Sequence, residues 1–144
     1  MGRTQKVVID GEESEWREVA SGIPQGSVLG PMLFVCFVND LPDIVKSSVL
    51  LFADDTKIYS KVPKDHDQIQ EDLDNLQEWS ETWQLRFNAG KCKVMHIGKQ
   101  SEPGKYTMKA NGKIVELEET INEKDLGVNV DNKLKFDKHV QIQT

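Results

Sequence analysis

Residues 48–59 read SVLLFADDTKIY and carry the clearest structural signal in the chain. The stretch 48–53 is a short apolar run, typical of a strand that is buried on both faces. Residues 56–59 then alternate polar and apolar side chains, as a returning strand does. Asp54 and Asp55 lie between the two stretches. The sequence therefore predicts a hairpin with two adjacent carboxylates at its tip.

Two carboxylates at one hairpin tip can act as metal ligands. Along a regular strand, successive side chains point to opposite faces, but in a tight turn Asp54 and Asp55 can converge. Two buried anions that close repel each other, so one keeps its proton unless a cation lies between them. A divalent cation that prefers oxygen ligands, such as Mg²⁺, would neutralise the pair. The alternative is that Asp-Asp is only a turn dipeptide, and this dipeptide alone favours that alternative.

Length and charge limit the possible classes of protein. The chain has 144 residues and a net charge of −6, from 18 Lys and Arg against 24 Asp and Glu. This length predicts one ordinary domain or a piece of a larger one. The acidic balance argues against a domain that binds nucleic acid on its own.

The sequence predicts neither a membrane protein nor a secreted one. The longest apolar run, residues 31–38, is too short to span a membrane, and the N-terminus lacks the pattern of a signal peptide. Cys36 and Cys92 lie far apart and read as reduced thiols. We therefore expect an intracellular protein, nuclear or cytoplasmic, without a membrane partner.

A second candidate site is the loop at residues 22–27, which reads GIPQGS. Gly22 and Gly26 permit a close approach of backbone to a ligand. Pro24 and Gly26 flank Gln25, whose amide can hydrogen-bond a base or a ribose. The loop opens a helix, and helix N-termini favour anions such as phosphate. A simple connector between a strand and a helix is the alternative, and the loop alone favours it.

A third candidate is Lys91, next to a glycine in the segment WQLRFNAGKCK at residues 83–93. A cation near a metal-bound triphosphate could stabilise or protonate the leaving pyrophosphate. The alternative is a solvated basic loop. The three histidines and two cysteines show no spacing typical of metal ligands.

Two helices are predicted. Residues 28–45 place apolar side chains every three or four positions, and Pro42 should end or kink this helix at Leu41. Residues 66–83 form the second helix, for which Asp65 and Gln68 offer a capping box. Its apolar stripe runs from Ile69 to Trp83, while the opposite face carries acidic residues, namely Asp67, Glu71, Asp72, Asp74, Glu78 and Glu81.

The remaining strands are short. Turn signals at Asp10-Gly11 and Asn111-Gly112 predict hairpins, and strands are also expected at 93–97 and 126–130, whereas residues 134–144 are weakly patterned. Strands followed by helices without strict alternation indicate an α+β fold with an antiparallel sheet. With no internal repeat or linker, we expect one unit.

The order of these segments resembles the palm of reverse transcriptases, in the variant of non-LTR (LINE-type) retrotransposons. The resemblance covers nearly the whole chain and rests on residues 21–31 (SGIPQGSVLGP), 39–42 (NDLP), 51–56 (LFADDT), 76–79 (LQEW), 83–88 (WQLRFN), 91–95 (KCKVM) and 123–128 (EKDLGV). It implies an α+β palm whose antiparallel sheet has two helices packed on one face.

The resemblance also implies template-directed DNA synthesis by a two-Mg²⁺ mechanism, with an RNA template, a DNA primer and dNTPs as partners. Asp54 would hold metal, and Asp55 would complete the carboxylate pair. The loop of Gly22, Pro24, Gln25 and Gly26 would line the nucleotide and template. Lys91 matches the region that handles pyrophosphate. Residues 126–127 would fall in the hairpin that grips the primer.

One departure from the family pattern shapes the expected activity. The first catalytic motif supplies a third metal-binding Asp well upstream of the Pro-Gln-Gly loop, but Asp10 is the only Asp before that loop, and it sits in a turn. We expect residues 1–144 to be a partial domain that lacks the fingers, the first catalytic motif and the thumb. Magnesium binding should be weak or absent, and the chain should be inactive alone. A non-catalytic RNA-binding or interaction remnant, or the product of a decayed gene, are the alternatives.

Overall fold

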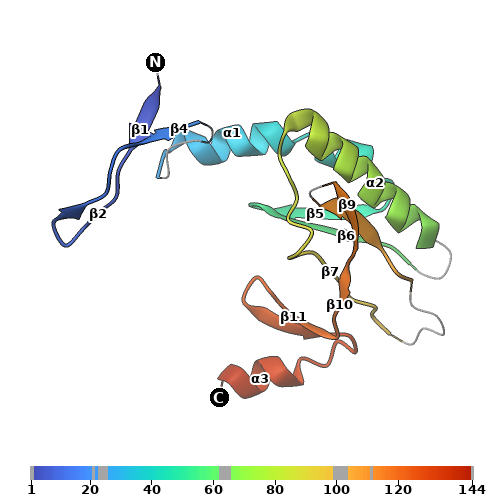
Figure 1. Cartoon of the computed structure of the whole chain (residues 1–144). Helices are drawn as coiled ribbons and strands as arrows, with labels where there is room; N and C mark the ends of the chain where they lie inside the picture. The colour runs from blue at the N-terminus through green and yellow to red at the C-terminus, as the bar shows by residue number, and fades with distance from the viewer. Residues whose placement is uncertain are drawn as a thin grey trace. The chain divides into compact units, whose positions relative to one another are not determined.

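The computed structural model describes residues 2–20, 22, 26–61, 66–98, 104–110 and 112–143. The chain divides into two compact units, residues 1–39 and 40–144, and each is described by itself. Figure 1 shows the elements of both.

The first unit consists of two hairpin ladders and one helix. Strand β1 (Arg3–Gln5) pairs antiparallel with β4 (Arg17–Val19), and β2 (Val8–Ile9) pairs with β3 (Glu12–Glu13). Asp10 and Gly11 both have positive φ, 52° and 89°, as a two-residue type I′ turn requires. The expected turn at Asp10-Gly11 is confirmed.

Helix α1 (Leu29–Val38) completes the first unit and is shorter than predicted. It stops before Pro42, and the chain continues as the 3₁₀ helix η1 (Leu41–Ile44), with the proline in its first turn. The predicted break at Leu41 is therefore correct. The apolar spacing every three or four positions predicts one wide apolar face, but α1 is apolar nearly all round, and Leu29 and Leu33 are 62% and 55% exposed.

The second unit begins with η1 and the predicted hairpin. Strand β5 (Ser48–Phe52) pairs antiparallel with β6 (Asp55–Tyr59), in a register that sets Phe52 opposite Asp55. The prediction that β5 is buried on both faces is wrong, since Leu50 and Phe52 are 56% and 59% exposed. With β6 as its only partner among the described strands, β5 leaves its other edge unpaired.

Helix α2 (His66–Trp83) has the bounds that its periodicity predicts, and it anchors the segment before β5. Asp72 accepts the backbone N–H groups of Lys46 and Ser47 at 2.8 and 2.9 Å. Asn75 donates to the Ile44 carbonyl at 3.2 Å, and the Trp79 indole donates to Asp40 at 3.1 Å. These three side chains lie on one face because they are spaced three and four residues apart.

Asp72 was predicted to lie with the other acidic residues on the face of α2 opposite the apolar stripe, but it is buried. Its residue is 0% exposed, whereas its neighbours Glu71 and Asp74 are exposed. A fully buried carboxylate is tolerated only where hydrogen bonds replace water, and here two backbone N–H groups do so. The capping residue Asp65 lies outside the described residues.

Short strands complete the second unit. These are β7 (Lys93–Val94), β8 (Thr107–Ala110), β9 (Lys113–Glu116), β10 (Glu118–Glu119), β11 (Asn122–Asp125) and β12 (Val128–Asp131). The pairs β8–β9 and β11–β12 are antiparallel, and β7–β10 is parallel. Helix α3 (Asp137–Gln143) follows where no regular element was expected. The result is a mixed α/β fold of small, mostly antiparallel ladders.

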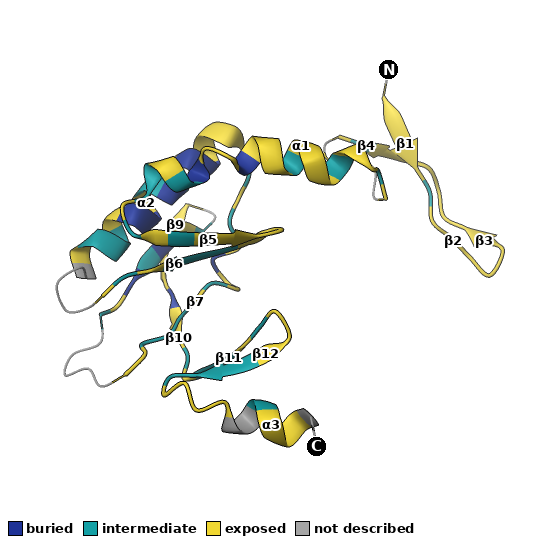
Figure 2. Cartoon of the chain, turned by 180° about the vertical axis from the view of Figure 1, so that it is seen from behind, coloured by how far each residue is buried: buried dark blue, intermediate teal, exposed yellow. Residues whose placement is uncertain are grey.

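The hydrophobic core lies in the second unit, where α2 meets β8. Its buried members are Leu73, Ala89, Tyr106, Met108 and Leu117. Figure 2 shows the buried residues gathered along α2 and the strands next to it, while the rims of the hairpins are exposed. Gln70 adds two hydrogen bonds, to the backbone N–H and carbonyl of Thr107 at 2.9 and 3.1 Å. Helix α2 is thus the element on which the second unit is organised.

Candidate active site

The two candidate carboxylates lie at the tight turn of the β5–β6 hairpin. Ala53 and Asp54 form the two-residue turn, and Asp55 is the first residue of β6. Both aspartates are exposed. The predicted hairpin with Asp54 and Asp55 at its tip is confirmed, and both side chains are open to a ligand.

The turn is made by a residue that is seldom found in its conformation. Ala53 has a φ of 50°, in the left-handed region where a Cβ atom is unfavourable, by roughly 1–2 kcal/mol. Two-residue turns of β-hairpins require positive φ and usually recruit glycine or asparagine for it. The left-handed Ala53 lets the chain reverse within two residues and so keeps Asp54 and Asp55 at the very end of the hairpin.

The carboxylates of Asp54 and Asp55 are suitable ligands for a divalent cation, but two carboxylates are few for one site. Carboxylate oxygens are the ligands that Mg²⁺ prefers, and it commonly binds through one or two carboxylates plus phosphate and water. Across the described ranges, no group of three or more His, Cys, Asp or Glu residues is arranged to hold a metal ion. Asp54 and Asp55 therefore offer a partial site, open on the solvent side.

Lys91, the predicted cation, lies in the turn that joins α2 to β7. Its backbone N–H donates to the Asn88 carbonyl at 2.9 Å, and its side chain is exposed. In the part of the chain that the structure describes, no hydrogen bond or ion pair joins Lys91 to Asp54 or Asp55. The structure shows a solvated lysine on a tight turn, and its chemical role stays a prediction.

The glycine loop belongs to the first unit. Gly22 and Gly26 have φ of 91° and 81°, values that L side chains rarely adopt, and open space surrounds the position of a Cβ atom at each. Glycine is thus required at both positions by the backbone rather than by crowding. Arg3 donates to the Gly22 carbonyl at 2.7 Å and ties the loop to β1. Pro24 and Gln25 lie outside the described residues.

The hairpin predicted to grip a primer is also present. Leu126 and Gly127 form its turn with φ of 47° and 88°, between β11 and β12. The sequence predicted a strand at 126–130, but the first two of these residues make the turn. Strand β11 was missed because residues 122–125, NEKD, contain no apolar side chain.

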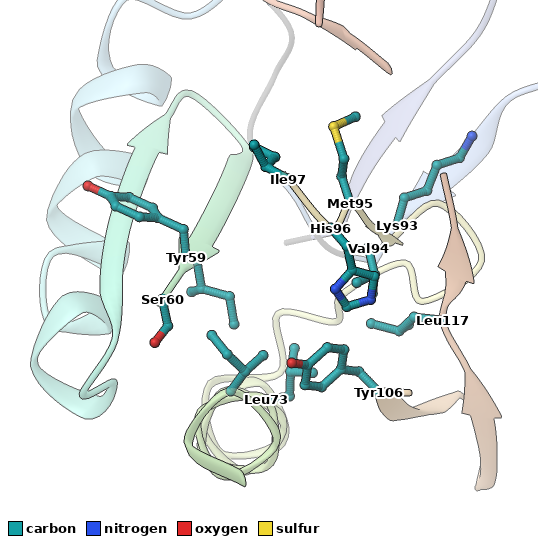
Figure 3. A pocket seen from close by; sticks show the side chains of 12 residues that line it. Tyr59, Ser60, Leu73, Lys93, Val94, Met95, His96, Ile97, Tyr106 and Leu117 are labelled. Atoms are coloured by element: carbon teal, nitrogen blue, oxygen red, sulfur yellow. The ribbon is translucent and has the colours of Figure 1, made fainter. Parts of the chain in front are cut away.

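A cavity of about 230 Å³ opens in the second unit between β6, α2 and β7. Figure 3 shows the His96 and Tyr106 rings side by side there, with Leu73 reaching toward them from α2; the ring centroids are 6.3 Å apart. Lys93 at its rim is bound to Glu123 at 2.8 Å, and His96 Nε2 lies 3.2 Å from the Gly104 carbonyl. Lys93 and His96, two of the polar side chains that line the cavity, are thus already engaged within the chain.

Comparison with known proteins decides the family. The family described as "Reverse transcriptase (RNA-dependent DNA polymerase)" matches residues 3–130. This chain belongs to the reverse transcriptase family. The resemblance drawn from its motifs is confirmed. No solved structure matches the chain.

Individual relatives of this reverse transcriptase segment come from mobile elements. The "RNA-directed DNA polymerase from mobile element jockey" of Drosophila melanogaster is 35% identical over 96% of the chain, and its counterpart in Drosophila funebris is also 35% identical. The "Probable RNA-directed DNA polymerase from transposon X-element" of Drosophila melanogaster is 32% identical over 96% of the chain. The chain spans only 16% of the length of each of these relatives.

Two further observations bear on the predicted properties of the segment. None of the described helices is both long and apolar enough to cross a membrane. Cys36 is exposed and Cys92 is partly buried, and neither forms a disulfide in the structure.

Proposed function

We propose that this chain is the palm segment of an RNA-directed DNA polymerase of a non-LTR retrotransposon. The observation that carries the proposal is the exposed pair Asp54 and Asp55 at a tight hairpin turn, inside the region that matches the reverse transcriptase family. In the whole polymerase, the segment would take part in template-directed nucleotidyl transfer by a two-Mg²⁺ mechanism. Its work would lie in the nucleus or cytoplasm, where an RNA template, a DNA primer and dNTPs meet.

The proposed domain is a partial one. Residues 1–144 would supply a palm-like antiparallel sheet with two helices packed on one face. The fingers, the first catalytic motif and the thumb of such a polymerase would fall outside these residues. The coverage of 16% of the mobile-element relatives supports a segment of this kind. Most phosphate contacts would then come from other, basic parts, which reconciles the charge of −6 with a nucleic-acid partner.

Each proposed role follows from the chemistry of the residue. Asp54 and Asp55 would hold Mg²⁺ through their carboxylates, and the bound ion would supply charge neutralisation at the reacting phosphate. Gly22, Pro24, Gln25 and Gly26 would line the nucleotide and template. Lys91 would stabilise the departing pyrophosphate. These roles rest on the family pattern and on the exposure of Asp54, Asp55 and Lys91.

The segment alone should be inactive, because a two-carboxylate site leaves two divalent ions poorly neutralised. The test is primer extension by the purified chain on an RNA template with Mg²⁺, with Asp54→Asn as the matched variant. We expect no templated dNTP addition by either protein. Templated addition that disappears in Asp54→Asn would contradict the claim of inactivity while supporting the assignment of Asp54.

A second candidate function is a non-catalytic RNA-binding or interaction remnant of a retrotransposon. The small donor set at the hairpin turn favours it over an active enzyme. RNA binding by phosphate contacts weakens steeply with salt, so a titration with RNA at low and high salt tests it. Binding at low salt that is lost at high salt would support the remnant. No binding at low salt would exclude it, and the charge of −6 leads us to expect that result.

A further inference from the structure

Two lysines on different strands hold the β11–β12 hairpin to the rest of the second unit. Lys57 of β6 forms an ion pair with Asp125 of β11, 68 residues further along the chain. Lys93 of β7 binds Glu123 of β11 at 2.8 Å, and its Nζ lies 4.0 Å from Glu118. Glu123 and Asp125 are two residues apart, so they share one face of β11. We call these four residues, Lys57, Lys93, Glu123 and Asp125, the lysine clamp.

The clamp is partly shielded from water. The side chains of Lys57 and Asp125 are 35% and 41% exposed, and those of Lys93 and Glu123 are 36% and 37% exposed. The hydrogen bond from Lys93 lowers the pKa of the Glu123 carboxyl, and that from Glu123 raises the pKa of the Lys93 ammonium. Isolated surface pairs contribute little, but charges that form a network with good geometry contribute more.

The position of the clamp matters more than its strength. Asp125 directly precedes the Leu126-Gly127 turn, and Lys57 lies two residues after Asp55 on the same strand. The ion pair therefore joins the middle of β6 to the turn end of the β11–β12 hairpin. In Figures 1 and 2, the two turns lie on the same side of the second unit. Strand β11 has no apolar side chain of its own. At the other end of the hairpin, backbone hydrogen bonds from Gly98 to the Asn132 carbonyl and from Thr120 to the Val94 carbonyl, at 3.0 and 2.8 Å, hold its base.

We propose that Lys57 and Lys93 are positioning residues that fix the β11–β12 hairpin beside the Asp54-Asp55 turn. One lysine alone would leave the hairpin free to pivot, while two pairs on different strands set both its place and its direction. The consequence for synthesis, that the hairpin presents a primer end to the carboxylates, rests on the proposed function. The clamp itself is a property of the chain and can be tested without any assay of polymerase activity.

The test is a charge swap followed by amide hydrogen exchange over residues 122–131 in the full chain. Lys57→Glu and Asp125→Lys each place like charges opposite each other, and we expect exchange in the hairpin to become about two- to fivefold faster in either variant. The double variant Lys57→Glu with Asp125→Lys restores opposite charges and should return exchange to the original rate. Lys57→Arg should also preserve it.

Lys124→Glu is the matched control, because Lys124 lies between the two acids on the other face of β11 and is exposed. It changes the charge of the strand by the same amount and should leave exchange unaltered. Added salt should accelerate exchange in the original chain and much less in Lys57→Met with Lys93→Met, because salt screens the pairs.

Single swaps that exchange like the original chain, or a double swap that restores nothing, would overturn the clamp. A single swap that unfolds the chain leaves the double variant as the deciding measurement. Neither result depends on metal or nucleotide binding. Failure of the clamp proposal can therefore be distinguished from failure of the proposed polymerase function.

Discussion

At the scale of the residue, Asp72 is the most consequential side chain outside the candidate site. Burial by itself raises the pKa of its carboxyl, but the backbone N–H groups of Lys46 and Ser47 together with Gln68 outweigh burial and leave the pKa below its ordinary value. The ionised carboxylate is therefore the form that the fold needs. Its hydrogen bonds hold Lys46 and Ser47, which lead into β5. Asp54 lies in the turn at the end of that strand.

Replacement of this carboxylate should cost stability. Asp72→Asn keeps the shape but turns an NH₂ group toward one of the two backbone donors, so we expect a loss of about 1–3 kcal/mol in the free energy of unfolding. Urea unfolding near neutral pH measures it. Asp74→Asn on the same helix is the control, because Asp74 is exposed and bonds only Gln70 among the described residues. An equal loss in both variants would refute the special role of Asp72.

The same residue predicts a pH dependence. Because the folded pKa of Asp72 is lowered, its ionisation stabilises the fold above the unfolded pKa of about 3.9, and this stability is lost as the pH falls through the folded pKa. The stability difference between the chain and Asp72→Asn should thus shrink on acidification. Glu123 and Asp131 also have lowered pKa values. Both residues are present in both proteins, so their contribution cancels in the stability difference. A difference that stays constant into acid would contradict the assignment.

At the scale of the element, the β5–β6 hairpin depends on the left-handed Ala53. A β-branched residue is far less tolerant of a positive φ than alanine, so Ala53→Val should destabilise the hairpin by about 1–2 kcal/mol. Ala53→Gly should be tolerated, because glycine adopts this φ freely. Amide exchange of residues 48–59 measures both variants. If Ala53→Val exchanges like Ala53→Gly, the turn does not require the conformation seen here.

Elements also differ in how far sequence alone could place them. Helix α2 was predicted to the residue, because the stripe from Ile69 to Trp83 keeps a helical period over four turns. Strand β11 could not be predicted, since NEKD has no hydrophobic pattern and the strand is held by ion pairs to lysines far away in the sequence. Helix α3, with the sequence DKHVQIQ, could not be predicted either, because it is short and lacks an apolar stripe.

At the scale of the whole molecule, the two units differ in what stabilises them. Nearly all residues buried in the described chain lie in the second unit, and Val38 is the buried one in the first. Local openings are easiest where few apolar contacts hold a segment. Amide exchange of the whole chain should therefore be fast in β1 to β4 and slow in α2 and β8. Equal protection in both units would show that the first unit is held by contacts beyond its own.

The candidate carboxylate pair could be predicted from sequence, because its two residues are adjacent in the chain. Asp54 and Asp55 are neighbours in the chain, and the apolar run before them predicts the strand that brings them to a turn. The lysine clamp could not be predicted in this way. Lys57 and Asp125 are 68 residues apart, and the local sequence around either residue does not indicate the other as its partner. Long-range polar pairs of this kind are fixed by the folded chain alone.

The central claim is that Asp54 and Asp55 form a partial and therefore weak site for a divalent cation, and Mn²⁺ offers the most direct measurement. Mn²⁺ is taken by the same oxygen ligands as Mg²⁺, and it broadens the NMR signals of nearby amides. The comparison lies in the same chain, because Asp10 also sits exposed in a two-residue hairpin turn but Gly11 separates it from the next carboxylate, Glu12, whereas Asp54 and Asp55 are adjacent. We predict selective broadening at residues 53–56 that Asp54→Asn and Asp55→Asn each reduce and Asp10→Asn leaves intact. Equal broadening at the Asp10 and Asp54 turns, or broadening that survives both substitutions, would contradict the claim.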